Sequence, residues 1–209
     1  MSPPPTKPPP AHPYRQIRAS YDDETITVYQ AYSAAIASEA VARQRLDASP
    51  LFRPGRMTWI KPSWCWMMYR CGYSFKDAGQ ARVLALKMRR GDFLGLLERA
   101  VLTTEGATIS TGAGAEVKVQ WDPERSPRLD RLEYRSIQIG IRGSVAAEWV
   151  EKWIVGIEDV TERARALKVA LDADANISEE ELVAQGLVPE ERPFDVSDTL
   201  REVLGMDRY

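Results

Sequence analysis

The chain has 209 residues, 44% of them hydrophobic and 28% charged, which is the size and composition of one globular domain. Its two cysteines and its one histidine, His12 near the start, exclude a Ser-His-Asp triad, a histidine-based zinc hydrolase and a metal site built from these residue types. No run approaches the roughly 18 apolar residues of a membrane span, and the start, MSPPPTKPPPAHP, lacks the apolar stretch of a secretory signal. We therefore expect a cytoplasmic or nuclear protein with no membrane partner.

The charge is distributed unevenly along the chain. Residues 14–145 carry 20 Lys and Arg against 14 Asp and Glu, whereas residues 146–209 carry 7 against 16. A positive body favours a polyanionic partner such as a nucleotide or a nucleic acid, with the acidic end as a solvated or autoinhibitory segment. Ordinary variation of charge along a soluble chain is the alternative explanation.

In chain order, the first half of the sequence predicts a leader followed by strands and helices. The proline-rich leader, residues 1–13, is expected to be disordered and polyproline-like. The long helix expected at 21–46 begins with acidic residues, which suit the positive end of a helix dipole. The other elements expected here are strands at 14–20, 56–60 and 81–88, a loop at 47–56, and helices at 62–71 and 91–103.

The second half contains the clearest strand patterns. These elements predict a single α+β domain over residues 14–175, with a mixed or mainly antiparallel sheet flanked by helices, and an acidic C-terminal extension over 176–209 with short helices. The expected elements are a turn-rich loop at 103–116, strands at 117–121, 135–143 and 154–161, a turn at 122–130, and helices at 144–153 and 162–174.

The two clearest strands each have an apolar and a polar face. In RSIQIGIRG three isoleucines alternate with Ser136, Gln138, Gly140 and Arg142. A sheet with one face in water shows the same alternation. A ligand site is the alternative, because the glycine leaves room for a ligand to approach the backbone. An arginine such as Arg142 can also bind phosphate through two parallel hydrogen bonds.

The segment WDPER is expected to form the turn at the mouth between these strands. It carries Asp122 and Glu124, and a carboxylate there can orient a sugar hydroxyl or stabilise a developing cation. The alternative is a structural ion pair with Arg125 or Arg128.

The aromatic stretch MTWIKPSWCWMMYRCG could be part of the hydrophobic core or the wall of a ligand site. Its helical part is apolar nearly all the way round, which is typical of a helix buried on several sides. The start of that helix differs, because Lys61 precedes a proline suited to the first turn and Ser63 can act as a cap. Unpaired backbone N–H groups, the helix dipole and a lysine together make a phosphate site. A plain capped helix after a strand is the alternative.

Arg15 and Arg18 lie in the first predicted strand. Residues three apart in a strand point to opposite faces, so at most one of the two can face a given site. The alternative is that both are ordinary solvated arginines.

Several long motifs occur in one order, and together they resemble the uncharacterised family DUF4291. They are RQIRASYDDETITVYQAYS, MTWIKPSWCWMMYR, WDPER and RSIQIGIRG, and the resemblance covers Tyr14 to about Arg165. The layout is also more distantly similar to the ADP-ribosyltransferase fold, in which a first strand carries an arginine or histidine and late strands carry a Glu or Gln. No His-Tyr-Glu set is present, since the only histidine lies in the leader, and no Ser-Thr-Ser strand or paired Glu-x-Glu stands out.

This second resemblance implies an enzyme that uses NAD as a substrate and transfers ADP-ribose to a nucleobase or a protein side chain. The basic body of the chain favours a nucleic acid or nucleotide as the acceptor. Arg15 or Arg18 would hold the dinucleotide, and Glu124 or Gln138 would orient the ribose and the acceptor. Cleavage of the bond to nicotinamide needs positioning and a nearby carboxylate rather than a histidine base. The candidate contacts to the dinucleotide are Arg15, Arg18, Lys61, Ser63 and Arg142.

Two other functions compete with this one. The first is a non-catalytic nucleic-acid-binding module, in which arginines such as Arg89 and Arg90 join Arg15, Lys61 and Arg142 in neutralising phosphates. The second is a nucleotidyl- or phosphoryl-transfer enzyme that uses Lys61, although the sequence has neither a glycine-rich phosphate loop nor a lysine-x-aspartate-glycine motif.

Overall fold

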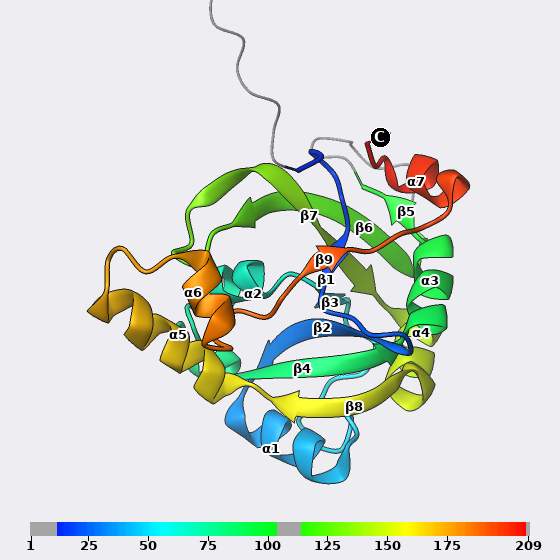
Figure 1. The fold of residues 1–209 in the computed structure, drawn as a ribbon. Coiled ribbons are helices and arrows are strands. Elements are labelled where there is room, and N and C mark those ends of the chain that lie inside the picture. The colour runs from blue at the N-terminus through cyan, green and yellow to red at the C-terminus, as the bar shows by residue number, and fades with distance from the viewer. Residues whose placement is uncertain (1–11, 104–113, 208–209) are drawn as a thin grey trace, which may run out of the picture.

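A computed structural model describes residues 12–103 and 114–207. Its strands form two main sheets and one short pair, β1-β9 (Figure 1). The main sheets have the orders β2-β4-β8 and β3-β7-β6-β5, and all neighbours are antiparallel except β5 and β6. This confirms the predicted α+β class. The strands are β1 (Arg18–Ala19), β2 (Thr25–Tyr32), β3 (Thr58–Ile60), β4 (Arg82–Arg89), β5 (Val101–Leu102), β6 (Val117–Arg125), β7 (Arg131–Ile141), β8 (Ile154–Asp159) and β9 (Arg192–Pro193).

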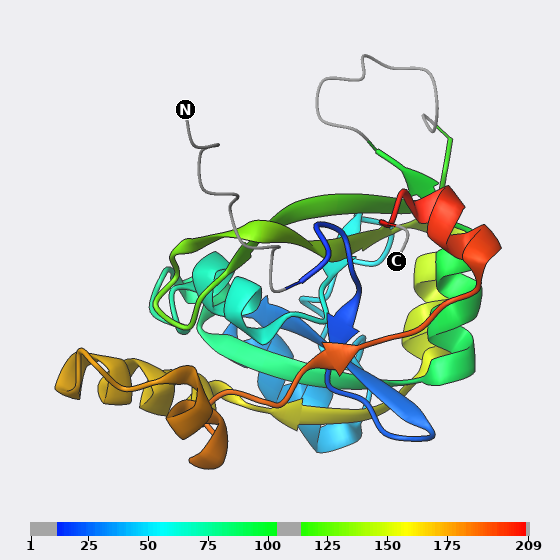
Figure 2. The ribbon, with the colours of Figure 1, turned by 45° about the horizontal axis from the view of Figure 1, so that its top comes forward.

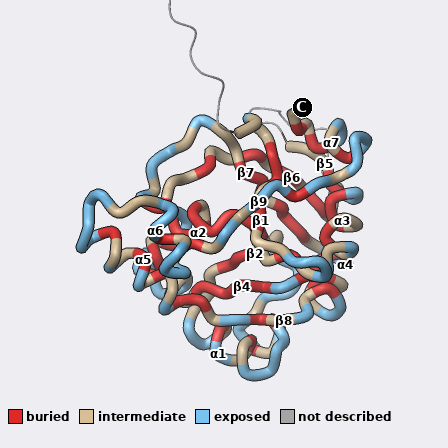
Figure 3. The backbone as a smooth tube through the Cα atoms, viewed as in Figure 1, coloured by how far each residue is buried: buried red, intermediate tan, exposed pale blue. Residues whose placement is uncertain are grey.

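Helices pack around both sheets and are mostly short. In the described part of the chain, none is long and apolar enough to cross a membrane. The tube in Figure 3 shows burial concentrated in the central strands, whereas much of the surface of α1 and α5 is exposed. The helices are α1 (Ala34–Arg43), α2 (Trp64–Cys71), α3 (Arg90–Glu98), α4 (Gly143–Glu148), α5 (Thr161–Ala173), α6 (Glu179–Ala184) and α7 (Asp198–Leu204), with a 3-10 turn η1 (Ala78–Gln80) and a π-helical turn η2 (Trp149–Trp153).

The two main sheets are joined at a bridge between Tyr29 of β2 and Lys61, which follows β3. The Tyr29 backbone N–H donates to the Lys61 carbonyl at 2.8 Å. Beyond this bridge β2 pairs with β4 and β3 pairs with β7, so the two strands belong to different sheets. Side chains near this junction therefore come from both sheets, and this is where the candidate site lies.

The predicted alternation of the late strands is confirmed. Ile137, Ile139 and Ile141 of β7 are fully buried, and they join the alternate residues Val117, Val119 and Trp121 of β6 in one hydrophobic cluster. A second cluster contains most of the apolar face of α2, together with Val83 and Ala85 of β4. The neighbours Leu84 and Leu86 belong to the first cluster, so β4 has apolar contacts on both faces.

The prediction of one long helix over residues 21–46 is wrong. Its first part is strand β2, and the helix begins only at Ala34, after Ser33. The carboxylate of Asp22 accepts hydrogen bonds from the backbone N–H groups of Glu24 and Thr25, which forms a turn in place of a helix start. The segment TITVY is rich in β-branched residues, and β2 pairs with β4 along its whole length.

The segment WDPER is also different from the prediction, because it is not a turn. Strand β6 continues through it to Arg125, with an irregular register between Pro123 and Arg125. The chain reverses further on, between Ser126 and Asp130, where Leu129 has a φ of 72°. Asp122 and Glu124 are therefore strand residues with fixed directions rather than loop residues at a mouth.

Several other predicted elements are confirmed with small shifts at their ends. Helix α2 is capped as expected: the Ser63 hydroxyl accepts from the Trp66 backbone N–H, and Gly72 ends the helix with a φ of 57°. Both cysteines of α2 are buried and unbridged. The helix expected at 91–103 is shorter, since α3 ends at Glu98 and the short strand β5 follows.

Residues 176–207 pack against the rest of the chain. Leu182 and Val188 belong to the second hydrophobic cluster, and Phe194, Leu200 and Leu204 belong to the first. Figures 1 and 2 show this segment crossing from α6, past the β1-β9 pair, to α7 beside β5 and α3. Most of the predicted leader and of the loop expected at 103–116 lies outside the described residues.

Candidate functional site

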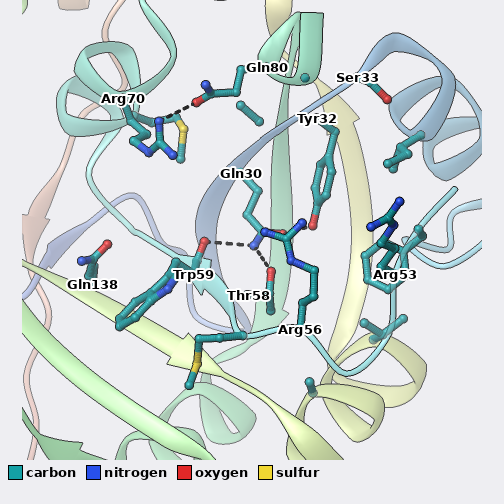
Figure 4. Close-up of a pocket in the computed structure, with 18 of the residues that line it drawn as sticks. Gln30, Tyr32, Ser33, Arg53, Arg56, Thr58, Trp59, Arg70, Gln80 and Gln138 are labelled. Carbon is teal, nitrogen blue, oxygen red and sulfur yellow. Dashed lines mark hydrogen bonds between the residues drawn. The ribbon is translucent and has the colours of Figure 1, made fainter. Parts of the chain in front are cut away.

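A cleft of about 1190 Å³ lies at the junction of the two sheets (Figure 4). Its size is slightly above the usual range of small-molecule sites, which is about 300–1,000 Å³. Its walls come from the end of β2, the segment 45–57, β3, α2, the middle of β6 and β7, and the π-helical turn after α4. Elements from both sheets therefore share one cavity.

On the β2 side, a network of hydrogen bonds fixes Gln30, Tyr32 and Thr58. The Gln30 amide nitrogen donates to the Trp59 carbonyl at 2.9 Å and to the Thr58 hydroxyl at 2.6 Å. Because a backbone carbonyl can only accept, the amide oxygen of Gln30 must face Tyr32, whose hydroxyl donates to it at 2.5 Å. Burial raises the pKa of Tyr32, so this phenol stays protonated and its oxygen can accept a further hydrogen bond.

The β6 and β7 side contributes two amides and one carboxylate. Gln120 and Gln138 are directly opposite each other in the ladder, and the Gln138 nitrogen donates to the Gln120 oxygen at 2.7 Å. Asp122 lies two residues further along β6 and also lines the cleft. The predicted candidate Gln138 is therefore a lining residue, accompanied by Gln120.

The space beside Gly140 is not available to a ligand. A Cβ atom at this position would lie 2.9 Å from atoms of Trp59 and Met57. Glycine is needed here because the Trp59 ring lies against the β7 backbone, so the expected ligand approach at this glycine is wrong. The indole instead forms part of the cleft wall (Figure 4).

Asp122 forms an ion pair with the buried side chain of Lys61. The Lys61 side chain is 1% exposed, and its Nζ lies 2.9 Å from Asp122 Oδ2 and 3.4 Å from the centre of a Trp66 ring. Burial lowers the pKa of Lys61 to about 8, although Asp122 acts in the opposite direction. At neutral pH the lysine is still mainly charged, so it can hold the Asp122 side chain in one orientation.

Arginines surround the opening of the cleft. Arg45 is paired with Asp47, and Arg70 donates to Gln80 at 3.0 Å. Arg53 and Arg56 are exposed and line the cleft, and they have no ion pair among the described residues (Figure 4). These two guanidinium groups are the ones best suited to meet an anionic ligand.

The start of α2 has a different environment from the expected phosphate site. The Ser63 hydroxyl donates to Glu124 Oε1 at 2.7 Å, and the Trp64 backbone N–H donates to Glu191 Oε1 at 2.6 Å. The predicted contacts Lys61 and Ser63 are buried and do not line the cleft. Carboxylates of the protein itself thus occupy the positions where an external phosphate was expected.

These carboxyl groups are held away from water. Glu124 is 5% exposed and does not line the cleft, and its burial raises its pKa. Glu191 is partly exposed as a residue, but its carboxyl group points inward at the start of α2, and burial together with the neighbouring Glu124 raises its pKa well above the usual range. The predicted catalytic residue Glu124 is thus a buried acid beside Ser63.

The three other predicted arginines make hydrogen bonds to backbone carbonyls outside the cleft lining. Arg15 Nη1 donates to the Gly205 carbonyl at 3.2 Å, and Arg18 Nη2 donates to the Glu191 carbonyl at 2.8 Å. Arg142 precedes α4, and its Nε donates to the Ala115 carbonyl at 3.1 Å. None of the three lines the cleft.

The sequence does not predict several of the residues that line the cleft. Gln30 and Tyr32 fall in the segment that the sequence predicts as a helix, and the arginines Arg53 and Arg56 fall in a predicted loop. The strand signal was present, because TITVY has the β-branched and aromatic composition of a strand. No local signal in the segment 47–56 showed that the loop would line a cavity.

Residues 16–194 match the family model described as "Domain of unknown function (DUF4291)". The match extends further toward the C-terminus than the resemblance seen in the motifs, and it includes the segment that carries Glu191. A search of curated proteins gives no match. In the described part of the chain, no group of three or more His, Cys, Asp or Glu side chains is arranged to hold a metal ion.

Proposed function

The chain belongs to the DUF4291 family, and we propose that it is an ADP-ribosyltransferase-like enzyme that binds NAD in the cleft and transfers ADP-ribose to a nucleic acid or nucleotide. The observation that carries the proposal is the composition of the cleft. Asp122 lines the same cavity as several aromatic rings and the arginines Arg53 and Arg56, and the other acidic lining residues, Asp47, Asp77 and Glu151, come from other elements than β6. A dinucleotide with two phosphates, two ribose rings and two flat bases is complementary to such a lining.

Binding divides between two kinds of contact. The guanidinium groups of Arg53 and Arg56 neutralise the pyrophosphate, and neither has an ion pair with a described residue that would first have to break. The rings of Trp59 and Tyr32 offer flat surfaces for a base. The amides of Gln120 and Gln138 are placed to hydrogen-bond ribose hydroxyls, since both line the cleft beside Asp122.

The reaction is a substitution at C1′ of the nicotinamide ribose. The bond from C1′ to the pyridinium nitrogen breaks, nicotinamide leaves with the electron pair, and the acceptor's lone pair forms the new bond to C1′. The acceptor's proton is released to Asp122 or to water. Asp122 also stabilises the oxocarbenium-like transition state, and Lys61 is a positioning residue that holds this carboxylate.

We thus assign to Asp122 the role first expected of Glu124, and keep Gln138. Glu124 is buried against Ser63, whereas the Asp122 side chain is 23% exposed and lines the cleft.

The nucleotidyl- or phosphoryl-transfer alternative loses its support, because the Lys61 amine is buried and paired with Asp122. The binding-module alternative keeps one observation, namely that Arg53 and Arg56 are exposed and have no ion pair among the described residues.

A transfer assay tests this proposal. The full chain is incubated with NAD labelled in the ADP-ribose part and with a single-stranded oligonucleotide, and labelled oligonucleotide is quantified for the wild type, Asp122→Asn and Arg43→Ala. Asn keeps an oxygen for Lys61, and the exposed Arg43 pairs with Glu39 outside the cleft, so Arg43→Ala serves as the control. We expect Asp122→Asn to lower transfer at least about 100-fold while NAD binding changes little, and Arg43→Ala to behave as the wild type.

Three results separate the alternatives. Wild-type transfer with Asp122→Asn overturns the assigned role of Asp122. Oligonucleotide binding without any NAD binding favours the non-catalytic module. If neither NAD nor the oligonucleotide raises the unfolding temperature, both the transferase and the binding module are overturned. A ligand at 100 times its dissociation constant should add about 2.7 kcal/mol to the free energy of unfolding.

A further inference from the structure

We infer that a single-stranded nucleic acid binds across the surface at the C-terminal end of α2, which we term the α2 shoulder, and enters the cleft from there as the acceptor. The inference deepens the proposed function and rests on it. It places the acceptor strand on residues outside the predicted site. The α2 shoulder consists of Tyr69, Arg70, Phe75, Lys76, Arg125 and Arg165.

Two aromatic rings of the α2 shoulder are exposed, and each has a guanidinium over it. Tyr69 is 44% exposed and Phe75 is 61% exposed. The guanidinium carbon of Arg125 lies 3.7 Å from the Tyr69 ring centre, and that of Arg165 lies 5.4 Å from the Phe75 ring centre. Exposed aromatic rings combined with guanidinium groups are the usual platforms on which single-stranded bases stack.

The backbone before Phe75 adopts a conformation that is unfavourable for its residues. Gly72, Tyr73 and Ser74 all have positive φ values, of 57°, 54° and 75°. Only the first of these is a glycine, so the turn carries local strain. The Tyr73 hydroxyl donates to the Pro127 carbonyl at 2.6 Å, and Arg165 Nε donates to the Ser74 hydroxyl at 2.9 Å, which holds the turn in place. The two residues before Phe75 are buried, whereas its own ring is turned out to solvent.

The α2 shoulder is continuous with the cleft. Tyr69, Arg70 and Arg125 line the cavity, and Phe75 and Lys76 follow in the same turn of chain. The Nε atom of Arg125 is buried and has no hydrogen-bond partner in the described part of the chain. A strand stacked on the shoulder therefore leads directly to the carboxylate-bearing wall of the cleft.

Charge favours a polyanion as the occupant. The α2 shoulder has four cationic side chains. Among the described residues, their one ion pair joins Arg165 to Glu162, which is 88% exposed. Stacking further selects single strands, since the bases of a duplex already cover each other's faces. A single-stranded RNA or DNA thus fits this surface better than a duplex or a neutral peptide.

The test is the binding of a labelled single-stranded 12-mer to the full chain, measured by fluorescence anisotropy without NAD. The variants are Phe75→Ala, Tyr69→Ala and Phe75→Trp. Tyr14→Ala is the matched control, because Tyr14 is 45% exposed and has Arg135 over its ring, outside the shoulder and the cleft. We expect each shoulder truncation to weaken binding about 10-fold, and the Trp variant and the control to bind as the wild type does. Thermal unfolding of each variant verifies that it is folded.

Equal weakening by Tyr14→Ala, wild-type binding by the shoulder truncations, or equal affinity for duplex DNA would each overturn the inference. Failure here is distinguishable from failure of the proposed function, because the assay contains no NAD. Binding of NAD without binding of the single strand would contradict the α2 shoulder as a nucleic-acid surface and leave the cleft as the NAD site. Binding of the strand through the shoulder without binding of NAD would support the surface and contradict the transferase.

Discussion

The start of α2 and the cleft lie beside each other, and both contain the ingredients of an anion site. At the start of α2, Glu124 and Glu191 accept the hydrogen bonds of Ser63 and of the Trp64 backbone N–H. In the cleft, Arg53 and Arg56 have no such internal partners among the described residues. A helix N-terminus with a lysine is therefore a weaker indication of ligand binding than exposed cations without partners at a cavity, because the protein can supply its own anions to the helix.

The largest expected effect separates two tryptophans. Trp64 is fully buried, and Trp64→Ala should lower the free energy of unfolding by about 3–5 kcal/mol. Trp59 is partly exposed in the cleft wall, so Trp59→Ala should cost only about 1–2 kcal/mol. Urea unfolding measures both values, and a larger cost for Trp59 would contradict the distinction between a closed and an open region.

The second prediction compares two cations. Lys61→Met leaves Asp122 without its buried partner and should lower the free energy of unfolding by about 1–3 kcal/mol. This loss is smaller than that expected for a fully buried pair, because Asp122 is 23% exposed. Arg56→Met should change stability by less than about 0.5 kcal/mol. Urea unfolding of both variants at pH 7 is the measurement, and equal costs would show that Arg56 has an internal role.

The third prediction concerns pH and Glu191. Because its folded-state pKa is raised above the ordinary value of 4.5, the folded protein keeps this proton to higher pH than the unfolded chain does. The wild type should therefore lose stability relative to Glu191→Gln as the pH rises from about 4.5 through the folded pKa, by at most about 1.4 kcal/mol per pH unit. Parallel stability curves for the two proteins between pH 4.5 and 8 would rule out a buried, protonated Glu191.

The smallest effect is expected at the two thiols of α2. Cys71 is fully buried, Cys65 is 9% exposed, and burial raises the pKa of both. Iodoacetamide should therefore leave them unmodified in the native protein and modify them in urea. Mass spectrometry follows the reaction, and rapid native modification would show that α2 opens.

The fold could be predicted from sequence where the pattern was local. The alternating isoleucines of β7 and the cap at Ser63 each reflect a few neighbouring residues, and both are confirmed. The helix assigned to 21–46 was wrong because its acidic start, at Asp22, forms a turn, and only pairing with β4 makes the following segment a strand.

The candidate site was harder to predict, since it depends on contacts far apart in the chain. The sequence identified Gln138, but it could not show that Glu191 reaches the start of α2 from 127 residues away. Nor could it show that Arg53 and Arg56, in an ordinary loop, line the same cavity as β6 and β7. Such positions follow from tertiary packing, which leaves no local pattern.

The most direct test of the account is a calorimetric titration of the full chain with NAD, using the wild type, Arg56→Ala and the control Arg43→Ala. We predict one binding site in the wild type, at least about 10-fold weaker binding in Arg56→Ala through the loss of a charged hydrogen bond, and unchanged binding in Arg43→Ala. No binding of NAD at millimolar concentration, or equal affinities in all three proteins, would contradict the assignment of the cleft as the dinucleotide site.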